Sequence, residues 1–477
     1  MRTKTLQSLL LVPALLIGLS SVLSAVPDTG PADQEKRHVY FVADGPSHGY
    51  GEHDHKAGTH LLANHLEKGV SGVETTVYTG GWPNADDAFK DADAIAMYCN
   101  GGGGHVAMGH LDQLDRLAKN GVGIVALHYA VEVPTGKPGS RFQDWIGGHF
   151  ETHHSVNPHW TINADDLPDH PIARGVSPFQ IHDEWYYHMR FREGMTGITP
   201  IIQDLPPKNT LLGRGWKPGK DSTPHHGNAD VWNAVVEQKQ PQVTAWATER
   251  DNAGRGFGFT GGHYHKNWAH DQFRRLVLNG IAWAAHVPVP DDGIRTETPT
   301  VEELEANHNE SGSYNEKKLR QQIAMWNTLN TNHLAFESDL VTPETEGNGV
   351  NVEVSVKDAN TLYLVARPGA DGSSCDWVTW ARPRLITSGG DTIKLTDLDW
   401  KSATSGWASV RKNKNVGGDD MNIDGASIPY GIGAHAASVI SYDLPDGVET
   451  FKTFAGLDDG GVEQCCGSTV KFRVYVD

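Results

Sequence analysis

Residues 123–127 read Gly-Ile-Val-Ala-Leu, and this run ends directly on His128 and Tyr129. A short run without polar positions is typical of a strand that is buried on both faces of a parallel sheet. The preceding residues, 110–119, carry leucines at helical spacing. A helix followed by a buried strand is the repeating unit of α/β proteins, and we predict that class here.

The same alternation extends to both sides of this strand. Helical spacing recurs at residues 58–67 and 271–285, an apolar run suited to a buried strand lies at 38–43, and further strands are predicted at 73–78, 94–99, 243–248 and 256–260. We therefore predict an α/β domain over residues 37–290, with a flavodoxin-like parallel sheet and helices on both faces.

Ligands of such sheets bind beyond the carboxyl ends of the strands. Three segments follow predicted strands and each contains histidine: 44–55, 100–105 and 128–132. We expect these segments to meet at one rim of the sheet.

The pattern changes after residue 290. Pro288 and Pro290 followed by the acidic stretch 291–305 predict a linker over residues 291–333, with one helix near 313–326. Short β-type runs separated by turn residues follow at 350–356, 361–366, 377–386, 439–444 and 470–476. This spacing predicts a C-terminal all-β sandwich of the jelly-roll type over residues 334–477.

The first 25 residues predict a signal peptide. Arg2 and Lys4 precede an apolar core at residues 9–19, and the small residues Ser24 and Ala25 offer a cleavage point. The apolar core is too short to favour a membrane span. We expect a periplasmic or secreted protein that does not associate with a membrane after cleavage.

The composition excludes one class of partner and locates the chemistry. The chain has 59 acidic and 40 basic residues, a net charge of −19, whereas nucleic-acid binding needs clustered lysine and arginine. Of its 25 histidines, 22 lie between His38 and His286. Histidine binds metals and transfers protons near neutral pH, so we place the chemistry in the first domain.

The first domain resembles the trehalose-utilisation (ThuA-like) family over about residues 37–290. The resemblance starts at the elbow formed by residues 123–129. It continues in Ser47-His48-Gly49-Tyr50, Trp145 to Gly148 with Phe150 and His153, His170-Pro171-Ile172, Asp183-Glu184-Trp185-Tyr186, and Gly261 to His265 with Asn267 and Trp268. This resemblance implies the class I glutamine amidotransferase-like fold, with His128 in place of the nucleophilic cysteine. It also implies metabolism in which disaccharides are oxidised to 3-keto forms and then cleaved or isomerised.

Several residues are candidates for a site at the predicted rim. A side chain that follows a strand on a sharp turn points toward the rim, so we predict His128 as a metal ligand or general acid/base. Only one of two neighbouring residues on an extended segment can enter the site, which leaves Glu184 as a base or Asp183 as a ligand. The predicted metal ligands are His48, His128, His153, Asp183, His263 and His265, and a histidine and carboxylate set of this kind suits zinc or a similar divalent ion.

Aromatic and amide side chains near these motifs suit a sugar, because sugar rings present apolar C–H faces. We predict a catalytic contribution from Tyr129 and substrate binding by Trp185, Tyr186, Asn267 and Trp268. The predicted function is a metal-dependent hydrolase, or a lyase or isomerase, that acts on a glycoside or an oxidised (3-keto) sugar. Two alternatives stay open: a non-catalytic glycan-binding protein with a structural metal, and a cysteine hydrolase that uses Cys99.

The C-terminal region is similar to the NPCBM family of carbohydrate-binding modules, which have a galactose-binding-like jelly roll. The similarity is clearest at Gly431-Ile-Gly-Ala-His435-Ala436. It implies sugar binding, for which Trp377, Trp380 and His435 are candidates. Export would also permit one disulfide among Cys375, Cys465 and Cys466, and the sequence does not choose the pair.

Overall fold

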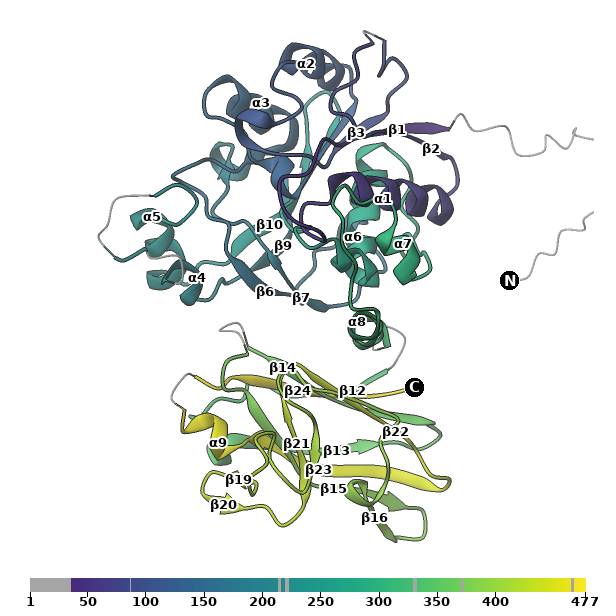
Figure 1. Ribbon diagram of the computed structural model, residues 1–477, viewed down its shortest axis with the longest axis vertical. Helices are drawn as coiled ribbons and strands as arrows, with labels where there is room; N and C mark the ends of the chain where they lie inside the picture. Colours follow the sequence, from purple (N-terminus) through teal and green to yellow (C-terminus); the bar gives the residue numbers. More distant parts are fainter. Residues whose placement is uncertain are drawn as a thin grey trace, which may run out of the picture. The chain divides into compact units, whose positions relative to one another are not determined.

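The computed structural model describes residues 36–85, 87–212, 216–218, 223–328, 333–369, 373–464 and 467–477 (Figure 1). The predicted signal peptide, residues 1–25, lies outside this set. Within the described part of the chain, no helix combines the length and the apolar character that crossing a membrane requires.

The first domain is built on a seven-stranded sheet with the order β2-β1-β3-β4-β11-β10-β9. The first five strands in this order are parallel, and β10 is antiparallel to both of its neighbours. The strands are β1 (Arg37–Val42), β2 (Val73–Tyr78), β3 (Ala94–Met97), β4 (Gly123–Leu127), β9 (Ile198–Asp204), β10 (Gln242–Glu249) and β11 (Arg255–Phe259). All five residues of β4 are buried, as its uninterrupted apolar sequence predicts.

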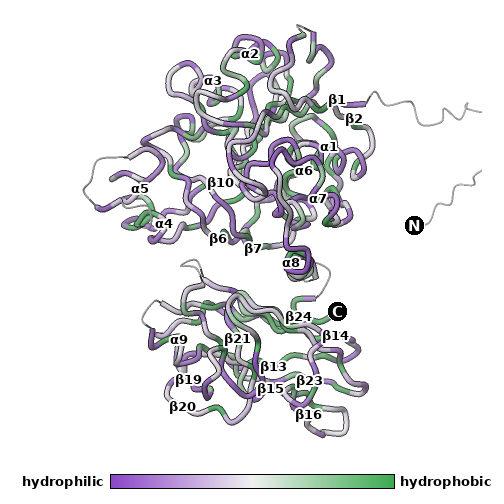
Figure 2. The backbone as a smooth tube through the Cα atoms, viewed as in Figure 1, coloured by the Kyte–Doolittle hydropathy of each residue, from purple (hydrophilic) through white to green (hydrophobic). Residues whose placement is uncertain are grey.

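Helices cover both faces of this sheet. One hydrophobic core lies between the sheet and α1 (His55–Gly69) and α6 (Asp271–Ala284), and a second core lies against α2 (Leu111–Lys119) and α3 (Lys137–Ile146). The hydropathy colouring shows apolar chain at the centre of the domain and polar chain outside it (Figure 2). The predicted α/β class with helices on both faces is therefore confirmed.

Smaller elements surround the sheet and position parts of the site. The hairpin of β6 (His159–Ala164) and β7 (Phe179–Glu184) lies outside the main sheet, as does the pair of β5 (Gly148–His149) and β8 (Arg190–Phe191). Short or peripheral helices are α4 (Asn209–Leu212), α5 (Ala229–Trp232), α7 (Val301–Glu305) and α8 (Glu316–Thr328). Leu304 of α7 and Leu319 of α8 are buried in the core that α1 and α6 share.

The C-terminal domain is an antiparallel β-sandwich. One sheet has the strand order β12-β24-β14-β22-β17, and the other has the order β13-β23-β15-β21-β18 with β16 paired to β15. The bounds are β12 (His333–Glu337), β13 (Gly349–Ser355), β14 (Thr361–Pro368), β15 (Trp377–Thr387), β16 (Thr392–Lys394), β17 (Ser402–Thr404), β18 (Arg411–Lys412), β21 (Gly431–His435), β22 (Ser438–Asp443), β23 (Val448–Leu457) and β24 (Val470–Val476). The small pair β19 (Asn422–Ile423) and β20 (Ala426–Ser427) and the helix α9 (Asp459–Val462) complete the domain. The inward faces of the two sheets form a single hydrophobic core, which confirms the predicted sandwich.

Candidate metal centre

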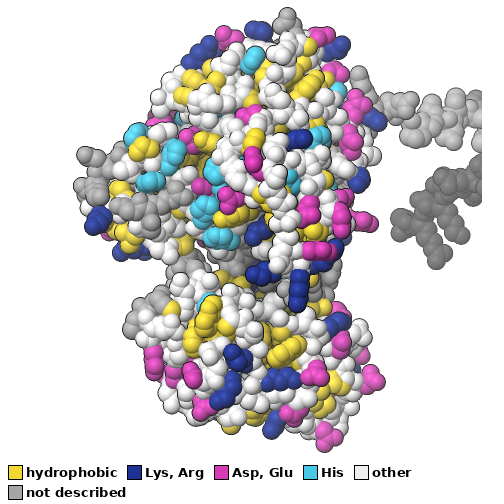
Figure 3. Space-filling model, in the orientation of Figure 1, with side chains coloured by type: hydrophobic (Ala, Val, Ile, Leu, Met, Phe, Trp, Pro, Cys, Tyr) yellow, Lys and Arg dark blue, Asp and Glu magenta, His cyan; other side chains and the backbone are white. Residues whose placement is uncertain are grey.

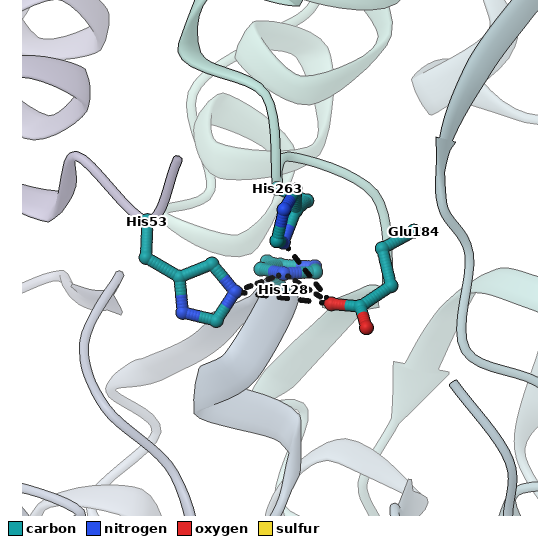
Figure 4. A group of neighbouring side chains, drawn as sticks. All are labelled: His53, His128, Glu184 and His263. Atoms are coloured by element: carbon teal, nitrogen blue, oxygen red, sulfur yellow. Dashed lines mark hydrogen bonds and ion pairs between the residues drawn. The ribbon is translucent and has the colours of Figure 1, made fainter. Parts of the chain in front are cut away.

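Among the residues that the structure describes, four buried side chains bring donor atoms together: His53, His128, Glu184 and His263 (Figure 4). Their donor atoms all lie within 4.8 Å of one another. Three of these residues follow parallel strands of the main sheet, because His53 follows β1, His128 follows β4 and His263 follows β11. Glu184 is the last residue of β7, so the hairpin supplies the carboxylate.

His128 is fixed in one orientation by the backbone. Its Nδ1 lies 2.7 Å from the carbonyl oxygen of Thr260, to which it donates, so Nε2 is left to face the cluster. Nε2 of His128 lies 2.9 Å from Nε2 of His53. The backbone is left-handed at both residues, with φ of 52° at His128 and 49° at His53. That conformation is costly for a non-glycine residue, and such strain is concentrated at functional sites.

The other two imidazole nitrogens of the cluster face inward in the same way. The hydroxyl of Ser47 lies 2.9 Å from Nδ1 of His53, which leaves Nε2 of His53 for the cluster. Nδ1 of His263 is buried without a hydrogen bond, 3.1 Å from Oε2 of Glu184. Oε2 of Glu184 also lies 3.6 Å from Nε2 of His128 and 3.8 Å from Nε2 of His53. A bound cation would satisfy these converging lone pairs, so this donor set fits a divalent ion.

Asp183 does not face the cluster but accepts hydrogen bonds that hold the backbone of two donor residues. Its Oδ1 accepts hydrogen bonds from the backbone N–H groups of His263 (3.0 Å) and Glu184 (2.8 Å). Its Oδ2 accepts hydrogen bonds from the N–H of Gly262 and the side-chain amide of Asn267, both at 2.9 Å. Asp183 therefore positions two of the four donor residues and directs its oxygens at the backbone.

The electrostatics of the cluster combine a neutral His53, an ionised Glu184 and a His263 whose pKa is raised. Burial lowers the pKa of His53 to about 2, so this side chain is neutral at physiological pH. Burial opposes ionisation of Glu184, but the three imidazoles around it outweigh that effect and hold its pKa well below the usual range. Burial also lowers the pKa of His263, but the Glu184 carboxylate reverses this and leaves the pKa of His263 above its ordinary value.

More accessible side chains border the cluster. The side-chain amide of Asn157 donates a hydrogen bond of 3.1 Å to the outer oxygen of Glu184, Oε1. Nε2 of His159 lies 3.8 Å from the same oxygen. The ring of His48 is exposed and lies 3.9 Å from the ring of His53. The space-filling view shows histidines gathered on this face of the domain (Figure 3).

Two tyrosines complete the surroundings of the cluster. The hydroxyl of Tyr186 is 3.3 Å from Nε2 of His128, and the ring of Tyr129 lies 5.2 Å from that of His53. Burial raises the pKa of both phenols, so each stays protonated. Tyr129 is partly exposed and can donate to a bound hydroxyl or carbonyl oxygen, whereas Tyr186 is buried and its hydroxyl faces His128.

The structure places other sequence-predicted residues elsewhere. His153 is exposed, and its carbonyl oxygen accepts a hydrogen bond from the side-chain amide of Asn228. His265 begins a short 3-10 helix, His265–Ala269, and its ring packs 4.9 Å from that of His308. Trp185 and Trp268 are fully buried core residues, so neither indole has a face exposed to a substrate. Asn267 is also buried, and its amide bonds Asp183 and the backbone of His182.

Sequence reasoning missed His53, Asn157 and His159. His53 lies on the rim segment 44–55, which also contains His48 and His55, and only the fold selects among the three. Asn157 and His159 lie before and at the start of β6, whose hairpin position was not predicted.

The cysteines are distributed as follows. Cys99 is fully buried, and burial raises the pKa of its thiol well above the usual value. A buried, protonated thiol does not suit a nucleophile, which disfavours the cysteine hydrolase. Cys375 is disulfide-bonded, while Cys465 and Cys466 lie outside the described residues.

The comparisons with known proteins agree with this architecture. The family described as trehalose utilisation (ThuA) matches residues 45–284. This chain belongs to the ThuA family. The ThuA match contains all four donors, and a second match, to the NPCBM/NEW2 carbohydrate-binding domain, covers residues 391–477.

Two solved structures of ThuA-like proteins are similar to this member of the family. The protein from Bacteroides uniformis is 16% identical, with a TM-score of 0.37, over 54% of this chain and 94% of its own. The protein from Parabacteroides merdae is 14% identical, with a TM-score of 0.35, over 59% of this chain and 98% of its own. No curated protein matches the sequence.

Proposed function

We propose that this protein is an exported, metal-dependent carbohydrate enzyme. It would act as a hydrolase, or as a lyase or isomerase, on a glycoside or an oxidised (3-keto) sugar, and its C-terminal domain would bind glycan. The observation that carries the proposal is the buried convergence of His53, His128, Glu184 and His263 inside a ThuA domain. The carbohydrate-binding domain on the same chain supports a sugar substrate.

The donor set favours zinc. Three imidazole nitrogens and one carboxylate oxygen are ligands that zinc prefers, and hydrogen bonds on Nδ1 of His53 and of His128 leave the Nε2 of each facing the cluster. A bound zinc ion would supply a Lewis acid for a carbonyl or hydroxyl oxygen and lower the pKa of water.

The chain itself supplies the groups that would hold a substrate beside the centre. Glu184 is ionised, and its Oε1 can accept a hydrogen bond from a substrate hydroxyl or from water on the side where His159 lies. The Tyr129 phenol stays protonated and can donate a hydrogen bond to a sugar oxygen, and the buried Tyr186 hydroxyl lies against His128. The burial of the four donors would exclude bulk water from the reacting atoms and strengthen these interactions.

Export and a location in the periplasm or outside the cell belong to the same proposal. The N-terminal sequence has the charged, apolar and small-residue regions of a signal peptide. Sugar-binding modules suit a protein that meets polymeric glycans outside the cytoplasm, and the disulfide at Cys375 suits an oxidising compartment.

A non-catalytic glycan-binding protein with a structural metal is the second candidate. One observation favours it: all four donors come from the protein, as in closed structural zinc sites, whereas catalytic sites keep a position for water.

Metal analysis combined with a substrate panel separates the candidates. The purified full chain is analysed for bound metal and assayed on glycosides and 3-keto-glycosides, with and without chelator. We expect about one zinc ion per chain, and turnover that is lost on chelation and in His128→Ala but kept in Cys99→Ala. Stoichiometric metal with no turnover on any substrate would favour the binding protein. Metal-free protein with undiminished turnover would overturn the proposal.

A further inference from the structure

An exposed aromatic stack lies on the surface of the β-sandwich. Trp407, in the loop between β17 and β18, is 52% exposed. Its ring stacks on that of Trp377 with the centroids 5.6 Å apart and the planes inclined by 18°. The edge of His435 lies against it at 6.1 Å. A single exposed apolar residue needs no explanation, but a stack of two indoles beside an imidazole does.

Glycines on neighbouring segments make room for Trp377, the less exposed member of this stack. A Cβ atom at Gly417 would lie 2.6 Å from the indole of Trp377, and one at Gly460 would lie 2.9 Å from it. At Gly461 a Cβ would approach Trp377 to 2.8 Å. Three glycines on two segments of the chain therefore pack closely on Trp377, and a larger residue at any of them would displace its side chain. Because Trp407 stacks on Trp377, the fixed position of Trp377 also determines the position of the exposed indole.

The backbone of Trp407 is also held in place. The hydroxyl of Ser405 donates to the carbonyl oxygen of Trp407 (2.7 Å) and accepts from the N–H of His435 (3.0 Å). The N–H of Gly406 donates to the carbonyl oxygen of His435 at 3.0 Å. His435 is in turn the cross-strand partner of Trp377 in the β15–β21 pair. The loop that carries Trp407 is thus joined to the strand ends beneath it, so the indole is ordered before any ligand arrives.

We propose that Trp407, supported by Trp377 and bordered by His435, is the sugar-binding platform of the C-terminal domain. Its ligand is a neutral hexopyranose ring within a glycan, which stacks its apolar C–H face on the exposed indole. The carbohydrate-binding family match covers both Trp407 and His435. This inference rests on the proposed glycan binding by that domain, and it does not depend on the metal centre.

The exposed apolar face of Trp407 suits a neutral sugar ring, and the bordering imidazole is compatible with one. Burial lowers the pKa of His435, so its ring is uncharged near neutral pH. Nδ1 of His435 lies 2.5 Å from the carbonyl oxygen of Ala436, to which it donates. An uncharged ring offers a sugar hydroxyl a hydrogen bond but offers a carboxylate or sulfate no ion pair.

Binding of the full chain to neutral glycans tests this assignment. Arrays of neutral oligosaccharides and the methyl glycosides of glucose, galactose, mannose and N-acetylglucosamine serve as probes, all in chelator so that the metal centre does not contribute. We expect Trp407→Ala to weaken binding by about tenfold or more, which corresponds to about 1.4 kcal/mol. Trp407→Phe keeps an aromatic face and should retain binding within about threefold.

The matched control is Leu340→Ala, which truncates another exposed apolar residue of the same domain, 44% exposed. It should bind as the wild type does, and thermal unfolding checks that each variant is folded. Wild-type affinity in Trp407→Ala would overturn the proposal, and so would a wild-type chain that binds none of the neutral probes at millimolar concentration. Either failure would leave the metal-dependent activity unaffected, so the two proposals fail separately.

Discussion

Replacing Asp183 by asparagine tests how the metal centre is held. The carboxylate accepts four hydrogen bonds, two on each oxygen. An asparagine keeps one oxygen and turns an N–H₂ group toward two donors, so two of the four bonds are lost. Hydrogen bonds to a charged acceptor contribute about 1.5–3 kcal/mol each, which places the loss of unfolding free energy at about 3–6 kcal/mol.

The same substitution should weaken metal binding without abolishing it. Asp183 bonds the backbone of His263 and Glu184, and groups that orient metal ligands typically contribute about 10–100-fold to affinity. Urea unfolding followed by tryptophan fluorescence measures the stability, and competition with a chromophoric chelator measures the zinc affinity. The control is Asp144→Asn, because this carboxylate is 61% exposed and its loss should change stability by less than about 0.5 kcal/mol.

Two results would refute this reasoning. Unchanged zinc affinity in Asp183→Asn would show that the backbone contacts do not position the donors. Complete loss of zinc with undiminished stability would show that Asp183 is itself a ligand, as the sequence allowed.

Three further predictions concern single side chains. The raised pKa of His263 keeps a proton on its imidazole near and below pH 6.5 in the metal-free protein, so zinc must displace this proton. The affinity for zinc should therefore rise with pH. Titration calorimetry in buffers of different ionisation enthalpy should detect proton release near pH 6.5. Burial lowers the pKa of His105 to about 4, so below pH 6.5 the unfolded state binds more protons than the folded state and the free energy of unfolding falls. In His105→Asn, the loss of unfolding free energy between pH 7 and pH 5 should be smaller by about 2 kcal/mol. An unchanged loss would contradict this. The buried, protonated thiol of Cys99 should resist iodoacetamide in the folded protein, and modification at the rate of a free thiol would argue against its burial.

The centre of the sheet was predictable from the sequence because its strands are buried. The interval 123–127 matches β4 without error, since an uninterrupted apolar run is typical of a strand buried on both faces. The interval 73–78 matches β2, an edge strand that alternates apolar and polar residues less regularly and is only partly buried. The rule that ligands bind at the carboxyl ends of strands also located the rim to which His53 and His128 belong.

The membership of the site was less predictable, because it depends on local backbone geometry. His263 and His265 were both predicted as metal ligands, which an extended segment would allow because residues two apart share a face, but the chain enters a 3-10 helix at His265 and the alternation ends there. Asp183 and Glu184 do alternate on β7, and the sequence could not tell which of them faced the centre.

Strand alternation also separates the two tryptophans of β15. Trp377 and Trp380 are three residues apart, so they point to opposite faces of their sheet. Trp380 is fully buried and packs on Phe472 in the core, whereas Trp377 supports the exposed Trp407. Trp407 itself lies in a loop, where no periodic pattern marks it.

The four donors enter the centre from well-separated stretches of the chain, and the order of these stretches has a consequence for assembly. His263 follows β11, which lies between β4 and β10 in the finished sheet. The donors therefore meet only after the middle of the sheet has closed, so a bound ion would be acquired by a folded chain and would not nucleate its folding. Once bound, the ion would act as a cross-link between loops that long segments separate, and removing it would free these loops while the sheet beneath them persists.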